Sequence, residues 1–276
     1  MTGFSSRLAT ALLLAAACLA QTPLPQPAPQ GNDVPAQLPF LLEMGGYDSH
    51  VTQGYGDWSG AQTTLWIRSN PIFIPAFFFD SQTRPTGTDQ DYGFFSYLNW
   101  TKNFYTTQGF SVAPQKDPLA VYFPKYRYDV KANWKLPPSR NLILGLGYTG
   151  WDLGGQGSGQ IFDVGTLWYH GKWIAEANLF VNRSTPGDLY SASGAVSVQY
   201  GREGKSWIGG TLGGGHQLYQ YVGQVPFNVS LEGYNAKVFY RKWLTRHVGF
   251  MVSFEYQDLL QTYRRTGGAG SLFFEF

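Results

Sequence analysis

The sequence has a single cysteine, few charged residues and no long apolar run. Charged residues make up 14% of the chain, and the formal net charge is only +2. A chain this close to neutral presents no basic surface for nucleic acid, so we expect no nucleic-acid partner. No apolar run reaches the roughly 18 residues that a transmembrane helix needs, which excludes that class of membrane protein.

The N-terminal segment has the features of an export signal. Arg7 supplies a positive charge, residues 9–17 form a short apolar run, and Ala20 offers a small-residue cleavage point. We therefore expect residues 1–20 to be a signal peptide. Cys18 sits in a context that loosely resembles a lipoprotein signal, so its lipidation stays open. Without lipidation, cleavage after Ala20 leaves no cysteine, and disulfides cannot stabilise the mature chain.

Two parts follow the expected signal. Residues 21–38 are rich in proline and glutamine, which predicts an extended or disordered periplasmic spacer without a core of its own. Residues 39–276 show alternation with a period of two, and no stretch has a convincing helical period. Aromatic residues make up 17% of the chain, and they favour strands. We therefore expect one all-β domain over residues 39–276.

Several segments alternate clearly enough to assign their two faces. In 126–135, Tyr126, Tyr128 and Val130 share one face, while Arg127 and Asp129 lie on the other. The same apolar and polar alternation occurs in four further segments, namely 142–149, 173–182, 190–200 and 248–257. These patterns predict strands with one apolar face and one polar face.

Short and longer connections separate the expected strands. The tight ones are 69–71, 137–140, 170–172 and 245–247. The longer ones are 53–60, 85–91, 154–160 and 221–226, and they are rich in glycine, proline or polar residues. This rhythm predicts an up-and-down antiparallel meander. Dividing the domain by the length of a membrane-spanning strand plus its connection gives about 12 strands, with roughly 10 to 14 possible.

The direction of the apolar face distinguishes a transmembrane β-barrel from a soluble one. A soluble exterior carries far more charge than this chain provides. Aromatic residues also gather near expected strand ends, as in the interfacial girdles of membrane barrels: Tyr126, Trp134, Trp173, Tyr190, Tyr200, Tyr240 and Trp243. We expect a closed barrel with its apolar face toward lipid. A soluble exported β-barrel that binds an apolar ligand is the alternative.

The last segment of the sequence resembles the C-terminal assembly signal of bacterial outer-membrane barrels. Leu272, Phe274 and Phe276 lie on one side of a strand that ends in phenylalanine. In hydrocarbon no strand edge can stay unpaired, so this strand must pair with the first one. An even strand number then places both termini in the periplasm. The expected partners are outer-membrane lipid and the barrel assembly machinery, and the expected state is a monomer.

Three short motifs carry a resemblance to a known family. They are residues 122–126 (YFPKY), 144–148 (LGLGY) and 199–201 (QYG). On these motifs, residues 40–276 resemble the YaiO family of bacterial outer-membrane β-barrel proteins. The resemblance implies location and architecture. It brings no established activity, so it assigns no catalytic residue, and some similar proteins carry helical repeats where this chain has its spacer.

The polar faces supply the candidate site residues. The charged side chains expected in the lumen are Lys125, Arg127, Asp129, Lys131, Lys135, Glu176, Lys237, Arg241 and Glu255. Unpaired charges inside a barrel are costly, so they need counter-charges or water. Two interpretations stay open: a cationic constriction that favours anionic solutes, and an internally paired network that fills a narrow barrel.

Catalytic, metal and cofactor sites have weak support in the sequence. A lipid-modifying enzyme would need a nucleophile beside a histidine, and only His50 and His216 lie near ends of expected strands. The histidines are scattered and cysteine pairs are missing, so we expect no metal and no cofactor. The glycine-rich residues 209–215 lack the lysine of a phosphate loop and predict a closely packed strand. The expected function is a narrow channel or a structural barrel without catalytic activity.

Overall fold

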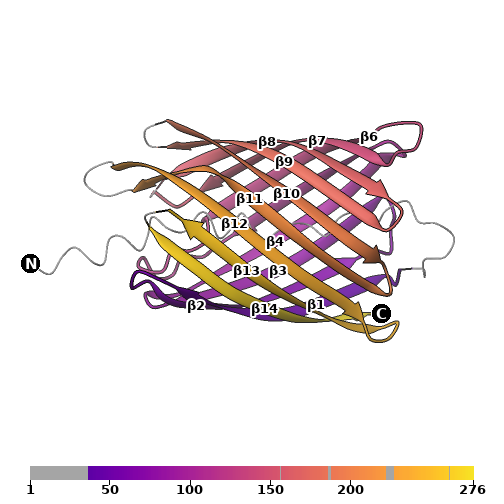
Figure 1. The fold of residues 1–276 in the computed structure, drawn as a ribbon, viewed down its shortest axis with the longest axis horizontal. Helices are drawn as coiled ribbons and strands as arrows, with labels where there is room; N and C mark the ends of the chain where they lie inside the picture. The colour runs from indigo at the N-terminus through magenta and orange to yellow at the C-terminus, as the bar shows by residue number, and fades with distance from the viewer. Residues whose placement is uncertain (1–36, 156, 186–187, 222–226, 261) are drawn as a thin grey trace, which may run out of the picture.

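The chain folds as a closed antiparallel β-barrel. The structure, a computed structural model, describes residues 37–155, 157–185, 188–221, 227–260 and 262–276. Each strand pairs with its neighbours in the sequence, and the strands cross the long axis obliquely (Figure 1). The strands are β1 Phe40–Val51, β2 Gly56–Ile67, β3 Phe73–Arg84, β4 Gly87–Thr101, β5 Phe104–Val112, β6 Tyr126–Lys135, β7 Leu142–Asp152, β8 Ser158–His170, β9 Trp173–Thr185, β10 Leu189–Arg202, β11 Ser206–Tyr221, β12 Phe227–Trp243, β13 Val248–Leu259 and β14 Tyr263–Glu275.

The first and last strands close the barrel. β1 and β14 pair antiparallel from Leu41 with Glu275 to Val51 with Arg265. Beyond this pairing, the amide of Phe40 donates to the Phe276 carbonyl at 2.9 Å and the Phe276 amide donates to the Phe40 carbonyl at 3.1 Å. No strand edge is left open between β1 and β14, which hydrocarbon requires. The predicted up-and-down topology is confirmed.

The predicted number of about 12 strands is wrong, because the barrel has fourteen. Two of the long connections expected from the sequence include residues that belong to strands. The connection between β3 and β4 is residues 85–86, where a loop was expected over 85–91. β2 likewise begins at Gly56, inside the loop expected over 53–60. The longest connection is residues 113–125, between β5 and β6, and it was not predicted.

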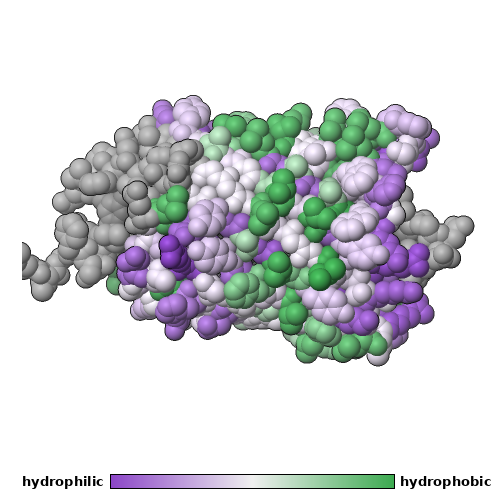
Figure 2. All heavy atoms as spheres, viewed as in Figure 1, coloured by the Kyte–Doolittle hydropathy of each residue, from purple (hydrophilic) through white to green (hydrophobic). Residues whose placement is uncertain are grey.

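The apolar faces of the strands point outward. Leu146, Val164 and Leu179 are 63%, 58% and 57% exposed on the outside of the barrel. Hydrophobic side chains cover the flank of the barrel, and hydrophilic ones are more frequent toward its two ends (Figure 2). A soluble protein would not expose so many large apolar side chains. The soluble alternative is therefore wrong.

The aromatic residues expected in girdles lie outside with one exception. Six of them, Tyr126, Trp134, Trp173, Tyr190, Tyr200 and Tyr240, are 38–64% exposed. Trp243 is only 6% exposed and points into the barrel. The reason is its odd spacing from Tyr240, because residues three apart on a strand face opposite sides.

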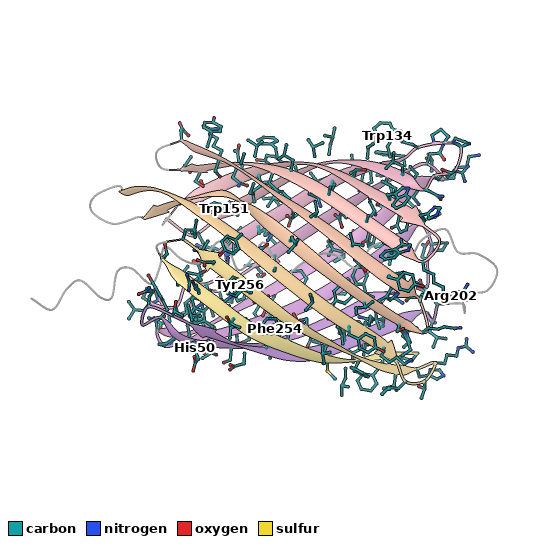
Figure 3. All side chains as sticks on the ribbon, in the orientation of Figure 1. His50, Trp134, Trp151, Arg202, Phe254 and Tyr256 are labelled. Atoms are coloured by element: carbon teal, nitrogen blue, oxygen red, sulfur yellow. The ribbon has the colours of Figure 1, made fainter. Side chains whose placement is uncertain are left out.

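The barrel has two distinct ends. At the termini end lie the first residue of β1, the last of β14 and the turns that follow the even-numbered strands. At the loop end lie the turns that follow the odd-numbered strands, including residues 113–125. Trp134 and Arg202 lie near the termini end and His50 at the loop end (Figure 3). No helix among the described residues is long and apolar enough to cross a membrane.

The pairing of β1 with β14 depends on a glycine. A Cβ on Gly45 would lie 2.4 Å from the Gly270 carbonyl oxygen, whereas a Cβ on Gly270 would meet no atom within 4 Å. We expect Gly45→Ala to lower the free energy of unfolding by roughly 1–3 kcal/mol, the usual cost of overpacking. Gly270→Ala is the matched control and should leave stability equal or slightly higher. Urea unfolding in lipid vesicles measures both, and equal stabilities would contradict the close approach.

Candidate functional site: the barrel interior

A cluster of buried apolar side chains fills the lumen at the termini end. We call it the plug. Its buried members are Leu41, Trp66, Ala76, Tyr97, Tyr105, Ile143, Tyr169, Ile174, Trp243 and Phe273, with Ile74, Phe95, Leu167 and Trp207 packed against them. Nearly all stand at strand starts or ends that meet at the termini end. Strands from around the barrel therefore contribute to one dry cluster.

The plug is closely packed. Trp66 stacks on Tyr97 with ring centroids 5.9 Å apart, and Trp243 meets Phe273 edge-on at 5.0 Å. The buried plug residues are at most 8% exposed. Aromatic pairs at these distances add stability beyond the area that they bury. The plug therefore leaves little room for water at this end of the lumen.

A buried ion pair borders the plug. The Arg241 guanidinium donates from Nη1 to Glu43 Oε2 at 2.8 Å, and the Ser271 hydroxyl donates to Glu43 Oε1 at 2.6 Å. Arg241 also lies over the Phe273 ring, 3.8 Å from its centroid. These contacts connect β12, β1 and β14 across the closure of the barrel. Arg241, predicted for the lumen, is there; Glu43 was not predicted.

Two further charged groups lie just outside the strands at the termini end. Arg68 approaches Glu275 at 3.8 Å. Burial raises the pKa of Glu203, and the nearby Arg68 and Arg241 only partly oppose this rise. Burial likewise lowers the pKa of Arg68. Acidic and basic side chains therefore both lie next to the plug at the termini end of the barrel.

The middle of the lumen holds a paired polar network. Lys131 of β6 contacts Asp163 of β8 at 2.5 Å and donates to Asn178 of β9 at 3.0 Å. Asn178 in turn donates to Glu176 at 2.7 Å. The side chains of Lys131 and Asp163 keep 26% and 13% of their surface exposed. Water therefore reaches this part of the lumen, unlike the plug.

Arg127 and Asp129 form a second group in the same region. Their side chains pair at 2.9 Å, and the Thr149 hydroxyl donates to Asp129 at 2.5 Å. Asp129 stays 29% exposed. Both residues lie on the inner face of β6, where the sequence placed them.

The remaining predicted lumen residues are spread over the interior. Lys135 lies with Nζ 5.1 Å from the Tyr105 ring centroid, at the edge of the plug. Glu255 pairs with Arg265 at 2.7 Å. Lys237 faces inward on β12 and makes no ion pair within the described chain. Lys125 is exposed just before β6, at the loop end, so it is not part of the strand wall.

Residues 113–125 fold back over the loop end of the lumen. Asp89 of β4 accepts hydrogen bonds at Oδ2 from the amides of Tyr122 and Phe123, at 2.8 and 2.9 Å. Arg84 lies between two rings, 4.4 Å from the Tyr122 centroid and 3.7 Å from that of Trp58. Tyr122 and Phe123 are 3% and 6% exposed. This tucked loop covers the inner side of the β3–β4 hairpin.

Sequence reasoning missed an acidic group under the tucked loop. Asp80, Asp89 and Asp91 point inward from β3 and β4 and are at most 7% exposed. The alternation of Asp89 and Asp91 was a usable signal, but it fell inside the loop expected over 85–91. In the described part of the chain, no three His, Cys, Asp or Glu side chains form a group that could hold a metal ion.

The histidines considered for catalysis do not meet a nucleophile. His50 is exposed on the outer face and pairs through Nδ1 with Asp57 at 2.8 Å. Its neighbour Ser49 faces the lumen and is 2% exposed, so the two side chains lie on opposite sides of β1. His216 belongs to β11, but its side chain lies outside the described residues. The glycine-rich residues 209–215 form part of β11, as predicted.

An outward apolar face, a closed ring of strands and a filled, polar-centred lumen define an integral outer-membrane β-barrel protein. The chain belongs to the YaiO family: the model of the YaiO membrane beta barrel domain matches residues 42–220. Its location is the bacterial outer membrane. No curated protein sequence matches the chain significantly.

Solved bacterial barrels share this fold at low sequence identity. A structure described as the CymD monoaromatic hydrocarbon channel is 8% identical, with a TM-score of 0.57 over 87% of this chain and 89% of that one. A bacterial polysaccharide outer membrane secretin is 7% identical, with a TM-score of 0.56 over 88% and 100%. Omp33 of Acinetobacter baumannii is 14% identical, with a TM-score of 0.50 over 87% and 100%. These likenesses establish the architecture alone.

Proposed function

We propose that this protein is a closed outer-membrane barrel that spans the membrane without conducting ions or solutes. The plug is the observation that carries this proposal. Its buried side chains come from ten strands around the barrel and occupy the lumen at the termini end. A barrel interior filled by side chains is a packed core, and such a core excludes hydrated solutes. The protein then acts as a structural or surface barrel.

The charge pairs in the lumen support the same proposal. A constriction for anions would need cations whose charge is available to a passing solute. Lys131, Arg127 and Arg241 are each paired with a carboxylate instead. The transport that the names of CymD and the secretin describe belongs to those proteins, because a likeness below 10% identity concerns the fold only.

We also propose that the barrel has no catalytic activity. A lipid hydrolase needs a nucleophile within hydrogen-bonding reach of its base. The contact of His50 with Asp57 could orient a base, but Ser49 faces the other side of the strand. The side chains of His50 and Asp57 are both largely exposed, at 73% and 69%.

The same geometry supports a proposal for the side of the membrane on which the termini lie and for the partners of the barrel. We propose that both termini face the periplasm after removal of a signal peptide over residues 1–20, with residues 21–38 as a periplasmic spacer. Leu272 and Phe274 lie on the outer face of β14 and the exposed Phe276 follows its last residue, which supports a role in recognition by the barrel assembly machinery. A closed ring with lipid around it supports a monomer.

Truncating the plug should make the barrel permeable. We expect the double variant Trp66→Ala, Tyr97→Ala to release small sugars from proteoliposomes, because it removes a stacked pair from the centre of the dry cluster. The wild type should retain them. Stopped-flow light scattering of liposome swelling measures the flux.

The matched control removes two aromatic rings from the outside of the barrel. Tyr126→Ala, Trp134→Ala changes residues that are 45% and 57% exposed on the lipid face. This control should stay as impermeable as the wild type. Rapid swelling with the wild type would overturn the proposed function, and an impermeable, folded plug variant would show that these two rings are not the barrier.

A further inference from the structure

Two buried carboxylates face each other inside the barrel below the tucked loop. Asp80 of β3 and Asp91 of β4 are direct partners in the antiparallel register, and both point inward. They are 7% and 4% exposed. Side chains at such paired positions have Cβ atoms roughly 4.5–5.5 Å apart, so the two carboxyl groups are close neighbours.

Neither group has a close counter-charge of its own in the described chain: Arg127 acts on Asp91, but it forms its ion pair with Asp129. Among the described residues, Oδ1 of Asp80 and Oδ1 of Asp91 have no hydrogen-bond partner. The nearest basic groups are engaged elsewhere. Arg84 donates to Gln82 at 2.7 Å, and Arg127 pairs with Asp129. Two adjacent carboxylates buried in this way repel each other and lose hydration unless a cation joins them.

A third oxygen points to the same place. The Ser111 hydroxyl of β5 is 3% exposed and lies beside Asp91, close enough to help stabilise its charge, and its oxygen accepts no hydrogen bond from any described group. This side chain is independent of the acidic pair, because it comes from another strand. Its unsatisfied oxygen is a ligand of the kind that hard cations prefer.

The third acid of the group has a different role. Both oxygens of Asp89 accept hydrogen bonds from backbone amides, two of them in the tucked loop. Asp89 therefore holds residues 113–125 over the pair and shields it from bulk water. Shielding strengthens the attraction between carboxylates and a bound cation, because the local dielectric constant falls.

We propose that Asp80, Asp91 and Ser111 form a binding site for a divalent cation that takes oxygen ligands, such as Ca²⁺. Two carboxylates balance the two positive charges, and water from the wet middle of the lumen completes the coordination. The cation joins β3, β4 and β5 beneath the tucked loop. Extracellular Ca²⁺ sites bind with dissociation constants of roughly 10⁻⁴ to 10⁻³ M, and we expect this site to fall in that range.

Terbium luminescence tests the site, because Tb³⁺ replaces Ca²⁺ at oxygen ligands and Tyr47 lies close enough to Asp80 to sensitise it. Chelator-treated wild type should give a tyrosine-excited Tb³⁺ signal that Ca²⁺ displaces. Asp80→Asn, Asp91→Asn should lose it, and each single variant should weaken it. Glu255→Gln, which changes an acid paired with Arg265, should keep it.

Heat-dependent gel mobility establishes that each variant is folded before the comparison. Without a Ca²⁺-displaceable signal from the wild type, the proposal is overturned. A folded double variant that binds as strongly as the wild type overturns it as well. The proposed function of the barrel is tested separately, because it depends on the plug and not on this cation site.

Discussion

Arg241→Met should lower the free energy of unfolding by about 3–5 kcal/mol, because it leaves a buried carboxylate without its partner. Arg241 is 3% exposed and its guanidinium lies 2.8 Å from Glu43. The Ser271 hydroxyl and the more distant Arg68 would remain to stabilise the Glu43 charge. Because these residues come from β12, β1 and β14, the loss falls on the closure of the barrel. Urea unfolding and refolding in lipid vesicles measures it.

A second substitution distinguishes the unpaired charge from lost packing. The double variant Arg241→Met, Glu43→Leu replaces the pair by apolar groups and should recover most of the lost stability. Arg183→Met is the control for an exposed pair with Asp188 and should leave stability unchanged. Equal stability of the single variant and the wild type would contradict the buried pair, and so would a double variant that is no better than the single one.

Asp89→Ala should release the tucked loop. The substitution removes the acceptor of two buried amides, those of Tyr122 and Phe123. Each buried donor left without a partner costs about 1–3 kcal/mol, which is enough to free residues 113–125 from the inner wall. We expect a protease added outside the cell to cut this segment in the variant and to leave it intact in the wild type.

A residue within the same loop supplies the control. Asp117 is exposed and accepts only a local hydrogen bond from the Leu119 amide at 2.9 Å. Asp117→Ala should therefore keep the loop resistant to the protease. Similar cleavage of both variants would mean that Asp89 does not hold the loop in place.

Alternation along the strands was enough to predict the class of fold. In β6 and β7 it assigned the outer and inner faces correctly, from Tyr126 to Trp134 and from Leu142 to Tyr148. The strand number was harder, because it depends on how short the turns are. Residues 85–86 suffice to join β3 and β4, and the polar residues that follow them have the composition of a loop although they belong to β4.

The plug could not be predicted from alternation. Period-two patterns contrast an apolar face with a polar face, but near the termini end both faces are apolar. Ile143, for example, lies inside the barrel between Leu142 and Leu144, which lie outside. A sequence cannot say whether such inward residues meet across the lumen, because they come from strands far apart in the chain.

The lumen charges illustrate a similar limit. The positions of Lys131, Arg127 and Arg241 on inner faces follow from the pattern, but their partners depend on the register between strands. Asp163 reaches Lys131 from two strands away, and Glu43 is 198 residues from Arg241 in the chain. The alternative of a paired network was open in the sequence, and the register is what favours it.

The electrical behaviour of single barrels in a planar lipid bilayer tests the closed lumen most directly. Purified wild-type protein that has passed the gel-mobility check for folding is inserted and held at both voltage polarities. We expect no reproducible current steps, because the proposal is that the plug closes the lumen at the termini end. Steady, uniform current steps at low voltage from the wild type would contradict the closed barrel and make the protein a channel.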